Sequence, residues 1–481
     1  MKTQNLDFTD IQGNILRGYR KLHVRHLVLS VSDRDAVANW LLDATGRDLR
    51  THQITNAEPW DEKPPTCLNV SFTGAGLEAL GVSQSVMKSF PPEFVEGMAS
   101  RATKIGDVGS SAPENWNSEW RSPQIPHLVV TVYADSEADC DELGRQVLAV
   151  GNGRAFILLA HLNGAALPHG KVHFGYRDNI AQPRFMGVSE TQNRPDMQPL
   201  VEVGAVLLGY PTPIEDVIFD LPTPNVLGIN GAFNAFRVLK QDVVGFEAFL
   251  TGAATTLLNS PLADEVLPAG IEYSWDPPMS RHDAFRELVA AKILGRWRNG
   301  VPIELSPFTP TPREPISEDQ LNNFGFQNDD GGTKCPMASH IRRCNPRDAR
   351  IVQRSTNHSR RIVRRGVPYG PLYDPALSDT SSSSSTVERG LLGSFICANL
   401  AVQFESIQYD WMNLGLLDPR ITGTNDVLVG NNDENFSCFS LPVANTTIEL
   451  RGFSRFTETR GGAYLFIPSL SALRHLAQRP T

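Results

Sequence analysis

The pattern of hydrophobic and polar positions predicts strands and helices that alternate with a short period through the first half of the chain. Apolar runs rich in β-branched residues predict strands at 24–31, 67–72, 128–133 and 155–162. Helical spacing of apolar residues predicts helices between them, at 35–42, 75–80 and 137–148. Three or four strands with helices on one side are typical of a ferredoxin-like α+β sheet.

The second half repeats this plan with long insertions. Its apolar runs predict strands at 201–208, 232–239, 391–400 and 462–467, and helical spacing predicts helices at 243–252 and 403–414. This order again fits an antiparallel sheet covered by helices. The sequence therefore predicts the α+β class, with two ferredoxin-like domains, each an antiparallel β-sheet flanked by helices, at 1–200 and 201–481.

The insertion between residues 260 and 390 contains most of the unusual chemistry. Residues 281–297 have the spacing of an amphipathic helix, whereas 302–315 is rich in proline and is expected to be irregular. Residues 374–386 end in a serine-rich, low-complexity stretch that predicts a surface loop. Such a loop is a poor place for catalysis.

Composition narrows the class of protein. A chain of 481 residues, 41% of them hydrophobic, is long enough to bury a large cofactor. The net charge of −9 disfavours a general nucleic-acid or anionic-membrane surface. The sequence shows neither a signal-peptide pattern nor a run of about 18 apolar residues, and its six cysteines form no CxxC pair. We expect a cytoplasmic protein with reduced thiols and without nucleic-acid or membrane partners.

The segment CPMASHIRRCNPR, at 335–347, combines one histidine with three arginines. His340 offers a metal a neutral nitrogen ligand, and Arg342, Arg343 and Arg347 offer fixed positive charges to carboxylates. A haem with its two propionates needs both. The alternative is a histidine on a basic helix face with no ligand at all.

Two further segments carry candidate chemistry. In FGYRDNIAQP, at 174–183, Gly175 and Asn179 tolerate positive φ, so a sharp turn there either aims the Asp178 carboxylate inward or uses it as a local cap. In RRIVRRGVPYG, at 360–370, a cluster of arginines suits a peroxide oxygen, a carboxylate or a phosphate. The alternative for this cluster is a solvated basic strand.

Together these segments resemble the dye-decolorizing peroxidase family. The resemblance begins at DIQGNILRGY, 10–19, passes through the three segments above, and continues in QFESIQYDWMN, 403–413, and TRGGAYLFIPS, 459–469. It covers nearly the whole chain. The resemblance implies two ferredoxin-like domains, with one haem b (iron protoporphyrin IX) per chain held mainly by the C-terminal domain.

The resemblance also implies an activity and roles for particular residues. The enzyme would reduce hydrogen peroxide to water while it oxidises dyes, phenolics or other bulky one-electron donors. His340 corresponds to the proximal iron ligand, and Asp178 and Arg364 correspond to the acid/base and the charge stabiliser opposite it. Arg347 corresponds to an arginine that contacts a haem propionate. If Asp178 is the proton shuttle, activity is expected to be highest in the acid range, because a carboxylate is a weak base.

Two positions depart from the family pattern. Asn179 follows the acidic residue where the family has glycine, and Gly393 follows two leucines where the family has an aromatic residue. The second change either widens the peroxide pocket or lets Phe395 fill it from a shifted register. Ile180 and Phe395 are both expected to contact the haem.

The sequence leaves several questions open. Candidates for the hydrogen-bond partner of His340 are Asp329, Asp330 and Glu405. The physiological reductant, any surface electron-transfer residue and the oligomeric state are not determined, with a homodimer as one option. Two rival functions are a haem-binding protein with little turnover and a haem-free protein whose basic turns bind acidic partners. A Soret band excludes the latter, and oxidation of a dye by peroxide separates the enzyme from the former.

Overall fold

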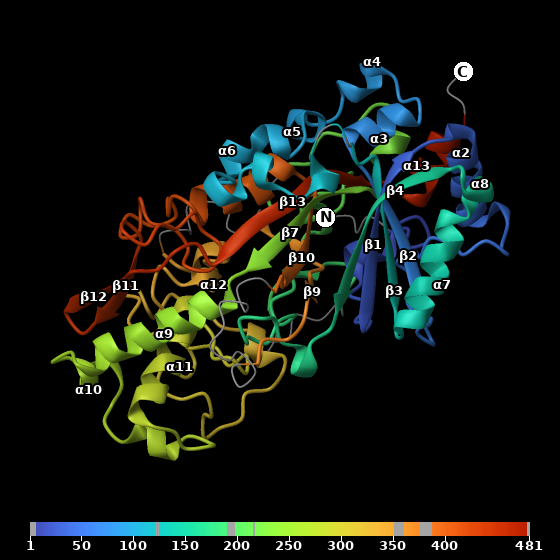
Figure 1. The fold of residues 1–481 in the computed structure, drawn as a ribbon. Coiled ribbons are helices and arrows are strands. Elements are labelled where there is room, and N and C mark those ends of the chain that lie inside the picture. Colours follow the sequence, from blue (N-terminus) through green and yellow to red (C-terminus); the bar gives the residue numbers. More distant parts are fainter. Residues whose placement is uncertain are drawn as a thin grey trace.

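One large antiparallel sheet forms the centre of the molecule (Figure 1). The computed structural model describes residues 6–121, 123, 125–189, 198–214, 217–350, 360–374 and 387–478. The strands follow one another across the sheet in the order β4 (Phe156–Ala165), β1 (His23–Val31), β3 (Leu128–Ala134), β2 (Thr66–Phe72), β13 (Thr457–Ile467), β7 (Ala232–Gln241), β10 (Gly390–Cys397) and β8 (Val363–Arg364), and β9 (Val367–Tyr369) also pairs with β10.

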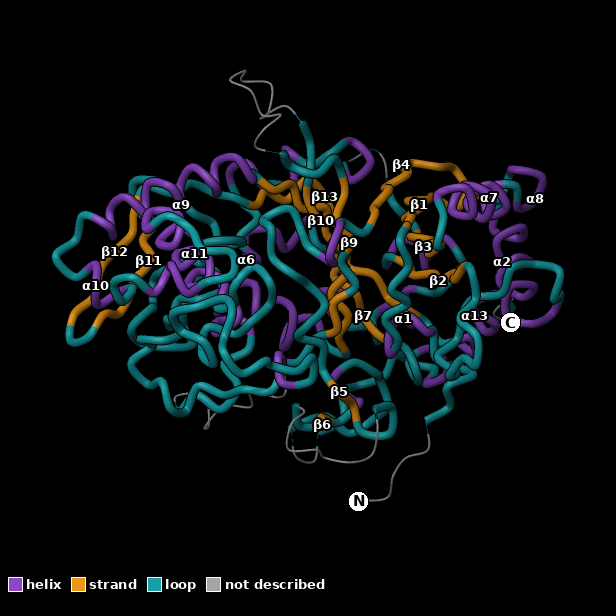
Figure 2. Tube along the Cα trace, turned by 90° about the horizontal axis from the view of Figure 1, so that it is seen from below, coloured by secondary structure: helices purple, strands orange, loops and turns teal. Residues whose placement is uncertain are grey.

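Helices and two small sheets surround this centre. The helices are α1 (Gly13–Leu16), α2 (Arg34–Leu42), α3 (Gly74–Ala79), α4 (Gln84–Met87), α5 (Pro92–Glu96), α6 (Ala102–Ile105), α7 (Glu137–Leu148), α8 (Val150–Gly153), α9 (Val243–Leu258), α10 (Ala263–Val266), α11 (Arg281–Leu294), α12 (His340–Cys344) and α13 (Leu470–Ala477). The small sheets pair β5 (Arg184–Phe185) with β6 (Leu200–Val201), and β11 (Cys438–Val443) with β12 (Thr446–Arg451). Helices α9 and α11 lie with the β11–β12 hairpin at one end of the molecule, and α2, α7 and α13 lie at the other (Figures 1 and 2).

The N-terminal half forms the elements that its sequence predicts. Strand β3 is buried along its whole length, as expected for an apolar strand inside a sheet. Helices α2 and α7 begin at the capping residues Asp33 and Ser136, whose side chains accept hydrogen bonds from the amides of Ala36 and Asp139. Local patterns and caps thus agree with the tertiary structure in this half.

The two halves share one sheet through β13. Strand β13 pairs with β7 along its length and meets β2 at the pair Phe466 and Phe72. The ring of Phe466 also contacts the rings of Phe90 and Phe233, with centroids 5.4 Å apart in each case. The predicted α+β class with antiparallel sheets and flanking helices is confirmed, while the domain boundary at residues 200 and 201 stays a prediction.

Three predictions for the second half need correction or restriction. The strand predicted at 201–208 is wrong, because β6 ends at Val201 and a tight turn follows, in which a Cβ on Gly204 would lie 2.2 Å from the Pro211 carbonyl oxygen. The helix predicted at 403–414 is instead two short π-helical segments, Leu400–Glu405 and Ile407–Trp411. Of the predicted surface loop 374–386, residues 375–386 lie outside the described part. No helix among the described residues has the length and apolar character to span a membrane.

A buried histidine in β1 makes the fold sensitive to acid. His26 is 2% exposed, its Nδ1 lies 2.9 Å from Thr131 Oγ1, and burial lowers its pKa to about 3. His26 therefore takes up a proton below about pH 6.5 in the unfolded chain but only near pH 3 in the folded chain. The free energy of unfolding consequently falls as the pH falls from about 6.5 to about 3. From pH 6.5 to about pH 4, the free energy of unfolding should fall by about 3 kcal/mol less in His26→Leu than in the wild type. Urea unfolding of both proteins at the two pH values measures it, and equal losses would contradict the assignment.

Candidate functional site

A large cavity lies where strands β13, β7, β10 and β8 face helix α12. Its volume is about 280 Å³. All six residues that the sequence predicts for the site line this cavity, namely Asp178, Ile180, His340, Arg347, Arg364 and Phe395. The fold thus brings together side chains from four separate segments of the chain.

His340 is held in place by a carboxylate. It is the first residue of α12, and its Nδ1 lies 3.2 Å from Oδ2 of Asp426. Asp426 is fully buried, and its Oδ1 accepts hydrogen bonds from the amides of Leu428 and Val429, both at 2.9 Å. Burial acts to raise the pKa of Asp426, yet the neighbouring His340 and Arg343 outweigh burial and hold that pKa below its usual range. The pair fixes the ring and leaves Nε2 free to bind an iron.

The three candidates named from the sequence as partners of His340 are wrong. Asp329 bonds to Arg342 instead, Asp330 pairs with Arg350, and Glu405 bonds to Arg101 and to the hydroxyl of Tyr464. Asp426 lies 86 positions after His340 in a loop without a recognised motif. Its one sequence signal is a turn-forming Asn-Asp pair just before an apolar stretch, which by itself indicates a cap rather than a ligand partner.

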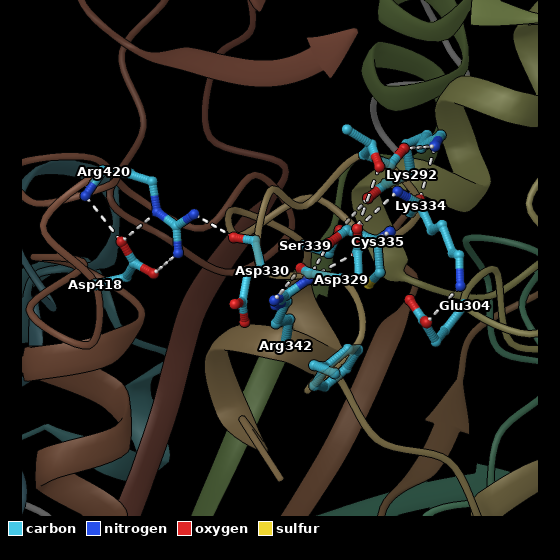
Figure 3. Close-up of polar contacts among 12 residues, drawn as sticks. Lys292, Glu304, Asp329, Asp330, Lys334, Cys335, Ser339, Arg342, Asp418 and Arg420 are labelled. Carbon is cyan, nitrogen blue, oxygen red and sulfur yellow. Dashed lines mark hydrogen bonds and ion pairs between the residues drawn. The ribbon is translucent and has the colours of Figure 1, made fainter. Parts of the chain in front are cut away.

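A largely buried polar network supports α12 (Figure 3). The side chain of Asp329 accepts hydrogen bonds from the amides of Lys334 and Cys335 and from the guanidinium of Arg342. The hydroxyl of Ser339, the residue before His340, donates to the carbonyl of Lys292 on α11. The network ties α12 both to the loop before it and to a neighbouring helix.

This network corrects one expectation about the arginines after His340. Arg342 and Arg343 are 2% and 0% exposed and point away from the cavity. Arg342 donates to the carboxylate of Asp329, and Arg343 donates to the carbonyls of Trp411 and Thr424. They therefore hold the polypeptide under His340 rather than a cofactor carboxylate.

The Asp329–Arg342 ion pair should contribute strongly to stability. Both side chains are 2% exposed, so Asp329→Asn leaves a buried guanidinium without its counter-charge and should cost about 3 kcal/mol. The matched control is Asp330→Asn, because Asp330 is the adjacent residue and its exposed pair with Arg350 should contribute less than about 1 kcal/mol. Urea denaturation measures both values, and similar losses in the two variants would refute the proposed importance of Asp329.

The acidic turn of residues 174–183 also lines the cavity. Asn179 has φ of 63°, so the residue that replaces the family glycine adopts the left-handed conformation that asparagine tolerates. The amide of Asp178 donates to the carbonyl of Gly170 at 3.0 Å, which fixes the backbone of the turn. Asp178 keeps its position despite the substitution.

Arg364 forms an ion pair with Asp178 in the cavity wall. Its Nη1 lies 3.5 Å from Oδ1 of Asp178, and both side chains are about one third exposed to the cavity or solvent. Gln182 holds the backbone of Arg364 twice, since it donates to the carbonyl at 2.9 Å and accepts from the amide at 3.2 Å. A proton-accepting carboxylate and a permanent positive charge thus stand side by side.

The cavity wall also fits the carboxylates of a haem. Nε of Arg361 and Nη2 of Arg296 have no hydrogen-bond partner among the described residues, and both side chains line the cavity. Burial lowers the pKa of Arg361 to about 10 and that of Arg296 to about 9. Bound carboxylates would satisfy these groups with charge-assisted hydrogen bonds. Arg347, which was predicted for this role, lines the cavity but already donates to the carbonyls of Asn322 and Phe324.

The cavity wall also offers a ligand for a metal, the ring of His340. Within the described ranges, no group of three or more His, Cys, Asp or Glu side chains is placed to hold a bare metal ion. His340 instead offers a single nitrogen to the cavity. One protein ligand suits an iron whose other ligands come from a porphyrin.

Comparisons with known proteins converge on one family. A family model described as a DyP dimeric alpha+beta barrel domain matches residues 10–166. Peroxidase 2 of Mycetinis scorodonius is 30% identical over 494 residues, which cover 98% of this chain and 87% of that protein. Dye-decolorizing peroxidase msp1 of the same organism is 29% identical over 492 residues, with the same coverage.

The chain belongs to the dye-decolorizing peroxidase family. Solved dye-decolorizing peroxidases share its fold. One of them, in complex with 2,6-dimethoxyphenol, has a TM-score of 0.80 and 25% identity, and the match covers 98% of this chain and 100% of that one. Another, from work on asymmetric sulfoxidation by engineering of the heme pocket, has a TM-score of 0.80 and 26% identity over the same shares. The enzyme is therefore an oxidoreductase with dye-decolorizing peroxidase activity, of a class that uses haem.

Proposed function

We propose that this enzyme reduces hydrogen peroxide to water at one haem b per chain, with His340 as the iron ligand and with Asp178 and Arg364 acting on the peroxide. The observation that carries the proposal is that His340 and the Asp178–Arg364 pair line the same cavity. When bound, the haem supplies the two electrons for peroxide reduction and recovers them from two one-electron donors.

Asp178 moves the proton in this proposal. Its carboxylate accepts the proton of one peroxide oxygen and returns it to the other, so that the second oxygen leaves as water. Together with two electrons and two protons, one peroxide gives two waters. Arg364 stabilises the negative charge that develops on the deprotonated peroxide, because its guanidinium is permanently charged and already placed 3.5 Å from Asp178.

The remaining residues of the wall hold and orient the cofactor. Asp426 would keep Nε2 of His340 available to the iron, because it holds the ring through Nδ1. Arg361 and Arg296 would hold the haem carboxylates, and Ile180 and Phe395 would contact the porphyrin, since all four side chains line the cavity. The complex of a related enzyme with 2,6-dimethoxyphenol supports phenols, alongside dyes, as reductants of this enzyme.

An absorption spectrum tests cofactor and chemistry together. The purified protein, loaded with haem, is recorded before and after one equivalent of hydrogen peroxide, and bleaching of a dye is then followed. A Soret band that changes on peroxide addition and steady dye oxidation are expected. A Soret band without turnover would leave a haem-binding protein, and no Soret band after reconstitution would refute the proposal.

A further inference from the structure

The ring of Phe395 lies over Gly393, two residues earlier on strand β10. A Cβ built on Gly393 would be 2.7 Å from Cε2 and 3.1 Å from Cζ of Phe395. Side chains two residues apart on a strand share a face, and here that face is the cavity wall. The ring therefore occupies the space that any side chain at position 393 would need.

This ring stands next to the proposed peroxide site. Phe395 pairs across the sheet with Arg364 on β8, so the two side chains leave neighbouring strands at the same level. Both line the cavity. The position of the ring consequently sets how much space lies beside the Arg364 guanidinium.

Packing limits the positions that the ring can take. Phe404, which also lines the cavity, packs beside it with ring centroids 5.6 Å apart, and the guanidinium of Arg237 lies 5.8 Å from the centre of the Phe404 ring. If the space over Gly393 is filled, the ring of Phe395 must move to another rotamer, and the cavity that it borders is the open space available to it. Gly393 does not have positive φ, so its role is to leave space rather than to permit an unusual backbone.

We propose that the Phe395 ring, housed over Gly393, sets the size limit of the peroxide compartment and so discriminates hydrogen peroxide from organic hydroperoxides. The inference rests on the proposed function. An organic hydroperoxide, ROOH, carries carbon on its outer oxygen, and with two electrons and two protons it gives ROH and H₂O. Its R group must fit beside the oxygen to which Asp178 returns the proton, which is where the ring borders the cavity.

Two variants move the size limit in opposite directions. Phe395→Ala removes the ring and should raise the rate with cumene hydroperoxide relative to hydrogen peroxide by about tenfold. Gly393→Ala fills the space under the ring, drives it toward the cavity and should lower the same ratio by about tenfold. The matched control is Gly252→Ala on α9, because a Cβ there meets nothing within 4 Å and Gly252 does not line the cavity.

A second measurement does not depend on turnover. The dissociation constants of cyanide and of 4-phenylimidazole are measured for the resting haem protein, so that a small ligand is compared with a large one. Relative to cyanide, 4-phenylimidazole should bind more tightly in Phe395→Ala and more weakly in Gly393→Ala, in parallel with the hydroperoxide rates. Ratios that stay within about twofold of the wild type in Phe395→Ala would overturn the proposal, even if Gly393→Ala fails to fold. A wild type that binds both ligands but does not react with peroxide would refute the proposed function, and the ligand ratios would still decide the role of Phe395.

Discussion

Asp178→Asn is expected to keep the Soret absorption of the haem and to react with hydrogen peroxide about 10³-fold more slowly. The amide has nearly the shape of the carboxylate but cannot accept the peroxide proton, so the loss should appear in the rate of the peroxide reaction and not in haem content. Stopped-flow absorption with excess peroxide measures this rate directly. Arg364→Leu should show the same separation, with a loss of about 10²-fold, because it removes a stabilising charge but no proton acceptor.

Glu318→Gln is the matched control for this pair. It makes the same exchange of carboxylate for amide, and Glu318 is bound to Arg177, the residue next to Asp178. Its side chain is exposed and does not line the cavity, so the peroxide reaction should be unchanged. If Asp178→Asn and Arg364→Leu both kept the fast reaction, the assignment of their roles would be wrong.

His340→Ala is expected to lose haem during purification. The substitution removes the one nitrogen that α12 directs at the cavity and leaves the Asp426 carboxylate buried without its partner. The ratio of Soret to protein absorbance measures the haem content, and its recovery with added free imidazole would show that the ligand and not the fold was lost. His282→Ala removes a half-exposed histidine of α11 and should retain full haem content. Full retention of haem by His340→Ala would exclude His340 as the iron ligand.

The sequence predicted which side chains line the cavity better than it predicted the residues that hold them in place. His340, Asp178 and Arg364 each stand in a short segment whose residue types suit a role, and all three line one cavity. Asp426 was missed because its role depends on a contact made 86 positions away from His340, and no local pattern marks such a contact. Arg342 was considered as a possible partner of cofactor carboxylates because it lies close to His340 in the sequence, and nothing near it in the sequence indicates the buried Asp329 that it bonds.

The same distinction holds for the fold. Strands such as β1 and β3 were predictable because their buried residues follow one another in the sequence as a short, mostly apolar run. The predicted strand at 201–208 has suitable apolar residues, but tertiary packing around Gly204 turns the chain instead. Local β-propensity predicts a strand there, but the final structure depends on contacts with residues distant in the sequence.

The position of β13 in the sheet has a consequence for how the protein is made. Strand β13 lies between β2 and β7, yet it is the last strand to leave the ribosome. Before residues 457–467 are synthesised, β2 lacks a neighbour on one side, and β7 lacks neighbours on both sides until β10 has been made. Exposed strand edges of this kind invite pairing with other chains. Completion of the sheet must then wait for the final strand, so nascent chains should need chaperones more than finished chains do.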